Sequence, residues 1–365
     1  MKFQILQDSF AKGLGIVSRY TANKGQLPIL ANILIEAHKD GVYLSATNLE
    51  IGIRLDIGGK TEDEGQITVP AKNLTEYVAS WPNGTVEVEL KDEKITVKSQ
   101  KYQATFATTD AREFPNIPRA EEQESRGVEV ESEVFKEISQ RVAFAASVDD
   151  SRPVLTGVRF IVQGSEFIAV ATDGFRLSQR LLRTTNDELP AIILPARTVV
   201  ELAKLSEGES VRMSVFPQNN QVIFDLGKIQ LTSRILEGNF PDVAKIIPRE
   251  FKTQVTVDRE EILKAVKSAG IFARENNNII KLSIINNQCS IRATGGQIGE
   301  NEATVEAEIE GDELQISFNY KYLLDFLNSI SAERVVMKFN ESVSPAVFMV
   351  EKDETLIHLI MPVRV

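Results

Sequence analysis

Apolar and polar residues alternate along the chain with two different periods. Six segments repeat apolar residues at the spacing of an amphipathic helix: residues 8–22, 71–81, 132–146, 196–206, 259–274 and 320–329. Runs between them place apolar residues at every second position, as in Val86–Leu90, and predict β-strands with one solvent-exposed face. The pattern predicts an α+β protein with helices packed on one side of strand-rich sheets.

Three of the helix starts carry capping residues. Asp8 or Ser9 opens the first helix, Ser132 the third and Asp258 the fifth. These side chains accept hydrogen bonds from the free N–H groups of a first helical turn. Glu261, three residues after Asp258, completes a capping box.

The whole pattern occurs three times. Val69–Lys72, before the second helix, returns as Leu194–Arg197 after 125 residues and more weakly as Phe318–Lys321. Ala46–Glu50 returns as Ala171–Phe175 at the same spacing. One period at separate landmarks indicates tandem copies of one domain. We expect three domains of two helices and about eight strands each: residues 1–120, 121–248 and 249–365.

Composition narrows the class of protein. Of the 365 residues 42% are hydrophobic and 25% are charged, which is typical of globular domains. No apolar run exceeds five residues, so no membrane-spanning helix is expected, and Met1–Phe10 does not resemble a secretory signal. The single cysteine, Cys289, excludes an internal disulfide and fits a reducing cytoplasm. We therefore expect a cytoplasmic protein.

The residues give little support to catalysis. His38 precedes a hairpin turn and His358 lies in a strand-like run, so both are interpreted as ordinary strand or turn residues. Cys289 has no CxxC partner, Gly295–Gly299 opens no helix, and Asp149-Asp150 fits a solvated turn. We expect no catalytic residue, no metal and no cofactor. A hydrolase built on a carboxylate pair stays an alternative, although no copy concentrates His, Cys or acidic residues.

The charge is unevenly distributed. A net charge of −11 argues against nucleic acid only if it is spread evenly, because phosphates are bound by Lys and Arg. The six predicted helices carry 12 basic and 8 acidic residues, a balance of +4, which leaves −15 for the rest. Lys72, Arg197 and Lys321 take the same place in the three copies. Basic residues are also ordinary on exposed helix faces, but helices that share one surface would make it suitable for DNA.

Several segments together resemble one known family. They are the opening MKF, Leu27–Leu30, Ala171–Gly174 with Arg176-Leu177, Gly238–Asp242, Ile247-Pro248 and the ending Met361–Val365. With the threefold repeat, these segments make the whole chain similar to the bacterial DNA polymerase III β subunits, the replicative sliding clamps.

This resemblance implies a function without catalysis. Family members form head-to-tail homodimers, rings of six domains with helices lining the hole. Such a ring encircles duplex DNA without reading its sequence and holds the replicative polymerase, the clamp loader and repair proteins through short linear motifs. An interaction scaffold of three repeats that does not encircle DNA is the alternative; ring formation would separate the two.

The resemblance also implies one partner-peptide groove per chain, because the first copy has Asn48-Leu49-Glu50 in place of Asp173-Gly174-Phe175. Phe175 stands where many members carry His, and Lys245 where Arg is frequent, which leaves the fine motif preference open. The implied groove residues are Leu155, Thr172, Gly174, Phe175, Arg176, Leu177, Pro241, Ile246, Val343, Met361, Pro362, Val363 and Arg364.

Two further sets of residues are expected from the charge map and the resemblance. The DNA-facing residues are Lys12, Lys24, Arg141, Arg197 and Lys264. The dimer contact is formed by Phe106, in an alternating run, and by Ile271 and Phe272, at the end of a helix.

Overall fold

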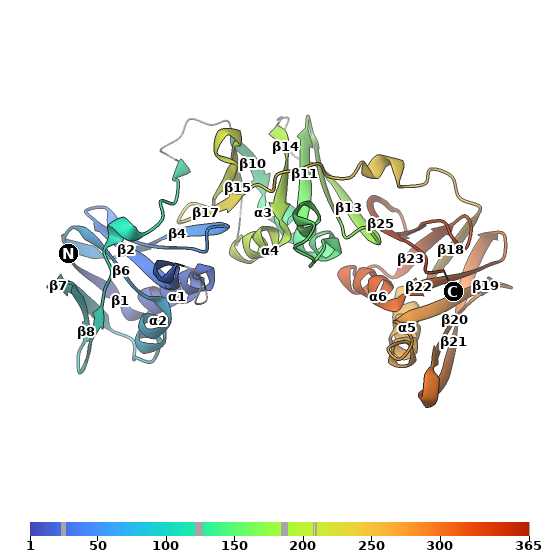
Figure 1. Cartoon of the computed structure of the whole chain (residues 1–365), viewed down its shortest axis with the longest axis horizontal. Helices are drawn as coiled ribbons and strands as arrows, with labels where there is room; N and C mark the ends of the chain where they lie inside the picture. The colour runs from blue at the N-terminus through green and yellow to red at the C-terminus, as the bar shows by residue number, and fades with distance from the viewer. Residues whose placement is uncertain (23–26, 121–126, 184–188, 207, 209, 365) are drawn as a thin grey trace. The chain divides into compact units, whose positions relative to one another are not determined.

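The computed structural model describes residues 1–22, 27–120, 127–183, 189–206, 208 and 210–364. The chain folds into two compact units (Figure 1). Unit 1 comprises Met1–Val130 and Gly208–Ile235, and unit 2 comprises Glu131–Glu207 and Leu236–Val365.

Every helix expected from the apolar periodicity is present. Within the described residues the α-helices are α1 Gln7–Val17, α2 Ala71–Ala79, α3 Ser132–Arg141, α4 Ala196–Leu205, α5 Arg259–Ala273 and α6 Tyr320–Ser329. They pack as neighbours in chain order, α1 with α2, α3 with α4 and α5 with α6. Two of the predicted segments end in short 3-10 turns instead of α-helix, at Ser18–Tyr20 and Ala143–Ala145.

The predicted caps are partly wrong. Asp258 caps α5 as expected, since its Oδ1 accepts from the backbone N–H of Glu261 at 2.9 Å. Asp8 and Ser9 do not cap α1, and Ser132 does not cap α3, because a strand runs directly into each helix. The N-cap is then the last strand residue, Leu6 or Glu131, with no side-chain cap.

Unit 1 contains two sheets. One has the order β5-β1-β7-β8-β9 and the other β10-β15-β16-β17-β4-β3-β2-β6. The strands are β1 Lys2–Leu6, β2 Asn32–His38, β3 Gly41–Thr47, β4 Ile51–Gly58, β5 Lys60–Asp63, β6 Gly65–Pro70, β7 Thr85–Lys91, β8 Lys94–Ser99, β9 Tyr102–Ala107, β10 Gly127–Glu131, β15 Ser210–Phe216, β16 Gln221–Asp225 and β17 Ile229–Arg234.

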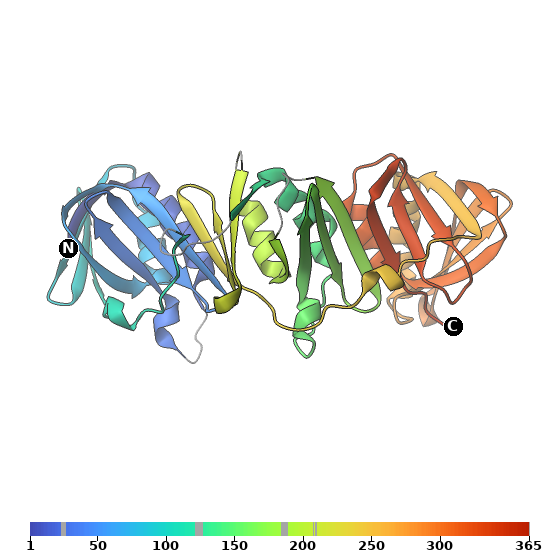
Figure 2. The ribbon, with the colours of Figure 1, turned by 90° about the horizontal axis from the view of Figure 1, so that it is seen from above.

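Unit 2 is built on one long antiparallel sheet, whose strands lie side by side in Figure 2. Its order is β14-β11-β12-β13-β25-β24-β23-β18-β21-β20-β19-β22. The strands are β11 Gly157–Gln163, β12 Glu166–Thr172, β13 Arg176–Arg183, β14 Leu189–Pro195, β18 Thr253–Asp258, β19 Ile279–Ile285, β20 Gln288–Gly295, β21 Gly299–Gly311, β22 Leu314–Asn319, β23 Arg334–Phe339, β24 Ala346–Val350 and β25 Asp353–Ile360.

Both units join neighbouring repeats by one rule of strand pairing. The fourth strand of a copy pairs antiparallel with the last strand of the next copy: β4 with β17, and β13 with β25. The register also agrees, because Gly52 lies opposite Thr232 and Leu177 opposite Leu359. These pairings cross the repeat boundaries, so β15, β16 and β17 of the second copy belong to unit 1 and β11 to β14 belong to unit 2. The chain therefore forms two compact units although its pattern repeats three times.

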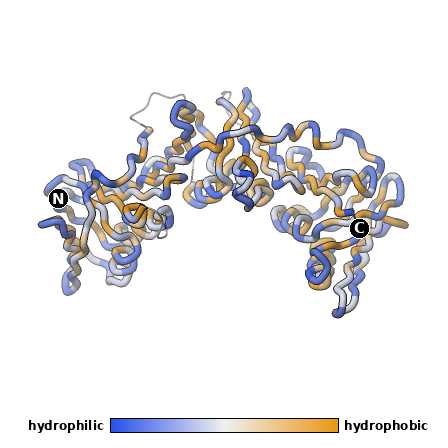
Figure 3. Tube along the Cα trace, viewed as in Figure 1, coloured by the Kyte–Doolittle hydropathy of each residue, from blue (hydrophilic) through white to orange (hydrophobic). Residues whose placement is uncertain are grey.

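The core follows the predicted apolar faces. Phe3 and Phe10 are fully buried in unit 1 with their rings edge to face at 6.2 Å, and Ile262 and Val266 of α5 are buried in unit 2, where α5 packs on β20 and β21. Figure 3 shows the resulting mixture of hydrophobic and hydrophilic positions along the elements. No described helix is long and apolar enough to cross a membrane.

Candidate functional site

The turn between β12 and β13 is held by its own side chains. Thr172 Oγ1 donates to the carbonyl of Arg176 at 2.6 Å and accepts from the N–H of Gly174 at 3.1 Å. Asp173 Oδ1 accepts from the N–H groups of Phe175 and Arg176 at 2.8 and 2.9 Å. Gly174 has φ +93°, a region that glycine enters without strain. The rigid turn presents Phe175, which is 58% exposed.

Arg176 fixes this turn to α6. Its guanidinium contacts Asp173 Oδ2 at 3.1 Å and Asp325 Oδ2 at 2.5 Å, and it donates to the carbonyl of Phe144 at 2.7 Å. It also lies 4.7 Å from the ring centroid of Tyr322. Because its donors are used within unit 2, Arg176 anchors the turn and offers little of its charge to a ligand.

The C-terminal segment lies beside the turn. The N–H of Met361 donates to the carbonyl of Phe175 at 2.8 Å, and that of Val363 to the carbonyl of Ser317 at 2.8 Å. Met361 packs on an apolar cluster with Leu177. The backbone hydrogen bonds therefore hold a flexible Met side chain next to an exposed Phe.

Two further segments complete the predicted set. Phe240 and Val243, on either side of Pro241, pack on the same apolar cluster, and Ile246 follows them with 39% exposure. On the other side, Arg152 donates to the carbonyl of Asp173 at 3.3 Å and its own carbonyl accepts from the N–H of Leu155 at 2.9 Å.

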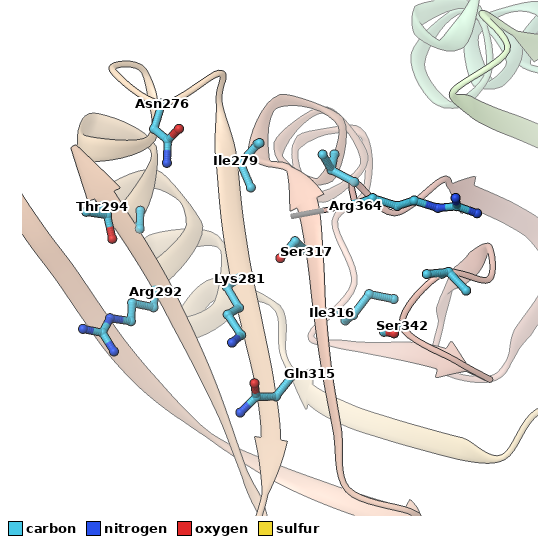
Figure 4. Close-up of a pocket in the computed structure, with 13 residues that line it drawn as sticks. Asn276, Ile279, Lys281, Arg292, Thr294, Gln315, Ile316, Ser317, Ser342 and Arg364 are labelled. Carbon is cyan, nitrogen blue, oxygen red and sulfur yellow. The ribbon is translucent and has the colours of Figure 1, made fainter. Parts of the chain in front are cut away.

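Val343, Val363 and Arg364 line a cavity of about 690 Å³ on the third copy. Figure 4 shows Lys281 and Gln315 of neighbouring strands on one side of it, while Arg364 points away from them. Polar side chains make up much of the lining. The predicted groove residues in this cavity therefore have more polar surroundings than Phe175 and Met361.

Burial divides the predicted groove residues into two groups. Phe175, Ile246 and Val343 are exposed, whereas Thr172 and Leu177 are 6% and 1% exposed and support the surface from below. Sequence reasoning did not include Arg152, Asp173 and Asp325 among these residues. Asp173 carried a signal, since an Asp before Gly commonly closes a turn, but Asp325 carried none.

The residues considered for catalysis lie in strands and turns. His358 is fully buried against Phe326, with the two rings stacked at 5.1 Å, and burial, followed by the nearby charge of Arg176, lowers the pKa of His358 to about 3. Asp149 accepts from the N–H of Ser151 in a turn, and His38 lies 3.6 Å from Glu36. Among the described residues no cluster of three His, Cys, Asp or Glu suits a metal ion.

Comparison with known proteins decides the family. Models of the DNA polymerase III beta subunit match in chain order: the N-terminal domain at residues 1–118, the central domain at 129–242 and the C-terminal domain at 244–364. The chain belongs to the DNA polymerase III beta subunit family.

Named relatives in this family are sliding clamps. The Beta sliding clamp of Bacillus subtilis (strain 168) is 32% identical over 378 residues, covering 100% of both chains, and that of Staphylococcus aureus (strain Mu50) is 29% identical over 376 residues, covering 100% of this chain and 99% of the relative. The Bacillus subtilis clamp structure has a TM-score of 0.95 at 30% identity and covers 100% of this chain and 99% of that one. A Pseudomonas aeruginosa clamp bound to griselimycin has a TM-score of 0.93 at 27% identity, with 100% of both chains covered.

These findings confirm the predicted resemblance, the α+β clamp fold and the sliding-clamp function, and they favour it over the non-encircling scaffold.

The basic residues predicted to face DNA differ in their exposure and in the ion pairs that they form. Arg197 is exposed, whereas Lys12 and Lys264 pair along their helices with Asp8 at 2.8 Å and Glu260 at 3.6 Å. Arg141 pairs with Glu137 at 3.6 Å, and its side chain is 25% exposed. Lys24 lies outside the described residues.

The residues expected at the clamp's dimer contact lie at two apolar surfaces, one in each unit. Phe106 is partly buried on β9 and packs edge to face on Tyr77, with ring centroids 5.8 Å apart. Ile271 is 57% exposed at the end of α5, and Phe272 packs partly on the core of the third copy.

Proposed function

We propose that two copies of this chain close head to tail into a ring around duplex DNA. The ring tethers the replicative polymerase, the clamp loader and repair proteins through short linear motifs, and catalyses no reaction itself. The protein acts in the cytoplasm, where a bacterial chromosome is replicated. Each chain contributes three domains to the ring, residues 1–120, 121–248 and 249–365.

Two free strand edges carry the ring proposal. Within the described part of the chain, β9 pairs as a strand only with β8, and the first half of β21, Gly299–Glu306, only with β20. β21 is the fourth strand of the third copy, and β9 is the last strand of the first. By the rule that pairs β4 with β17 and β13 with β25, β21 should pair with β9, the last strand of a further first copy. A second chain can supply this strand, and its own β21 can pair with β9 of the first chain.

The repeat also predicts the register of this contact. Gly52, Leu177 and Glu300 are equivalent, because each lies opposite the threonine of the repeated Ala-Thr pair, Thr47, Thr172 and Thr294. Gly52 and Leu177 face Thr232 and Leu359 across the repeat boundary. The corresponding residue of β9 is Thr105, so Glu300 lies opposite Thr105 of the second copy, and Gly299 opposite Phe106.

The side chains suit this register. Tyr102, 44% exposed, stacks on Trp81 beside Phe106 and Tyr77, and forms an aromatic surface on the first copy. The third copy offers Ile271 and Ile298, 57% and 52% exposed, as its apolar counterpart. A glycine opposite Phe106 leaves room for the ring. Large exposed apolar residues on both faces favour a buried contact over two free surfaces.

The partner groove is proposed around Phe175 and Met361. Their backbone bond fixes both residues on a turn anchored by Arg176, while Ile246 adds an exposed aliphatic side chain. A small apolar surface of this kind accepts the leucine and aromatic anchors of a short peptide. Met can adapt its shape to several partners.

The ring proposal is tested by DNA retention. The full chain, loaded by its clamp loader onto nicked circular DNA, should stay bound through gel filtration and leave when the DNA is cut. Phe272→Asp should sediment as a monomer, because a charge buried in an apolar contact is costly, and should not be retained. A wild-type monomer, or retention that survives linearisation, contradicts the ring.

The DNA contacts are tested separately. Arg197→Glu with Lys264→Glu should weaken loading and make it fall off at lower salt, because phosphate contacts act through charge without base readout. Lys228→Glu, in the β16–β17 hairpin, is the matched control. Unchanged loading of the double variant at every salt concentration would refute the assignment, and a changed oligomeric state would assign these residues to folding instead.

A further inference from the structure

The boundary between the first two copies carries the same turn as the proposed groove. Thr47 Oγ1 donates to the carbonyl of Ile51 at 3.1 Å and accepts from the N–H of Leu49 at 3.0 Å. Asn48 Oδ1 accepts from the N–H groups of Glu50 and Ile51 at 3.0 and 2.8 Å. These four bonds repeat those of Thr172–Arg176 one for one.

The neighbouring strand is attached in the same way. The N–H of Arg234 donates to the carbonyl of Glu50 at 2.9 Å, as that of Met361 does to the carbonyl of Phe175. Arg234 therefore takes the place of Met361, and Glu50 the place of Phe175. The backbone of the groove is present twice in the chain, once in each unit.

A cavity of about 320 Å³ lies at this first boundary. Its apolar wall includes Leu49, Pro115, Ile117 and Pro118. Ile117 covers Gly52, where an added Cβ would meet its Cγ2 at 3.1 Å. Amide and charged side chains also line it: Asn116, Asn219, Gln221, Glu50 and Arg234.

Leu49, at the edge of this cavity, has an unfavourable backbone conformation. It has φ +74°, in the left-handed region, where its equivalent in the second copy is Gly174. A leucine there is unfavourable, and its side chain is left 46% exposed. Strain of this kind is typical of positions where the side chain has a function.

The charged side chains of the lining indicate which kind of ligand the cavity can bind. Glu50 and Arg234 are exposed, and in the described part of the chain neither side chain forms an ion pair. Their free charges distinguish this boundary from the apolar Phe175 and Met361 of the other. An occupant with a carboxylate can pair with Arg234 while an aliphatic side chain contacts Leu49 and Ile117.

We propose that this cavity is a second peptide site. It takes a short extended segment of a partner protein that places one aliphatic side chain against Leu49 and Ile117 and a carboxylate on Arg234. The proposal rests on the proposed tethering function and adds a second site to the one groove per chain that the resemblance implies. It predicts partners that hold the clamp at two unlike sites, an apolar one and a mixed one.

The test uses the full chain with methyl-labelled Leu and Ile and the probe acetyl-Asp-Leu-Asp amide. The methyl resonances of Leu49 and Ile117 should shift saturably as the probe is added. Leu49→Gly should lower the affinity for the probe at least about fivefold, while the protein stays folded and is as stable as before or more stable. Arg234→Gln should weaken it similarly, whereas acetyl-Asn-Ala-Asn amide should not bind. The proposal is overturned if no saturable shift is seen, or if Leu49→Gly and Arg234→Gln bind the probe as tightly as the wild-type chain does.

A second probe separates this proposal from the tethering function. A pentapeptide with Gln and a Leu-Phe pair should bind at Phe175 and Met361, and Phe175→Glu should weaken it without affecting acetyl-Asp-Leu-Asp amide. If the pentapeptide binds and the acidic probe does not, the second site is wrong and the tethering function stands. If the acidic probe alone binds at Leu49, the second site stands and the groove is wrong.

Discussion

The turns Thr47–Ile51 and Thr172–Arg176 have one backbone and two sets of side chains. Both close by the same four hydrogen bonds, and both lie beside a strand pairing in the same register. Ile51 is 1% exposed in the core, whereas Arg176 reaches Asp325 on α6. The pattern of the repeat fixes where a site can form, and a few side chains decide its chemistry.

The largest effect is expected from making the second turn like the first. Arg176→Ile leaves Asp173 and Asp325 without their cation and should cost about 3 kcal/mol of folding free energy, less than a fully buried pair because Asp325 is partly exposed. Chemical denaturation of the full chain measures this. Asp325→Asn, which keeps the contact with Asp173, should cost about 1 kcal/mol; equal losses would show that Arg176 acts through another contact.

Side-chain exchange at the surface tests the groove. Phe175→Glu with Met361→Arg gives the second boundary the residues of the first and should weaken the Leu-Phe pentapeptide roughly 30-fold, about 2 kcal/mol, by removing the apolar centre. Fluorescence anisotropy measures the affinity. The dimer should sediment as before, because neither exchanged residue belongs to β9 or β21. Undiminished affinity places the groove elsewhere.

His358, at the boundary between the second and third copies, should make the stability of the fold depend on pH. Its pKa is lowered to about 3 in the folded chain by burial, so between that pH and its ordinary pKa only the unfolded chain binds the proton. Stability contributed by neutral His358 is therefore lost as pH falls from about 6.5 towards 3, about 2 kcal/mol by pH 5.

The equivalent of His358 at the first boundary is Leu231, opposite Ile53. His358→Leu should remove this part of the pH dependence. Denaturation midpoints at pH 8 and pH 5 measure the difference. An unchanged pH slope in His358→Leu would show that other groups titrate.

The smallest effect is expected at Leu49. Leu49→Gly matches the glycine of the second turn and should stabilise the chain by about 1 kcal/mol, because relief of the positive φ exceeds the added entropy of the unfolded glycine. Thermal unfolding measures it, with Asn220→Gly, another positive-φ position, as control. A loss of stability would show that the Leu49 side chain packs more than its exposure indicates.

Sequence reasoning reached the elements that depend on neighbours in the chain. Helices such as Tyr320–Ser329 follow from apolar spacing, and the Asp258 cap from a local motif. It missed contacts between distant residues. Asp325 lies 149 residues from Arg176, and no local pattern marks it as a partner. The cavity at Leu49 was missed because Asn48-Leu49-Glu50 lacks the glycine of its counterpart, and sequence alone does not show that Leu49 adopts the same φ region.

Disulfide trapping of the open strand pairing tests the central claim most directly. The predicted register places Glu302 opposite Gln103 of a second copy, and opposed residues of antiparallel strands lie within disulfide range, whereas diagonal ones do not. Gln103→Cys with Glu302→Cys should oxidise to a covalent dimer joined at both ends, while Gln103→Cys with Glu300→Cys should stay uncrosslinked. Cys289 should not interfere, because burial raises its pKa to about 12. Efficient crosslinking of the shifted pair, or of neither pair, would contradict the ring as derived from the repeat.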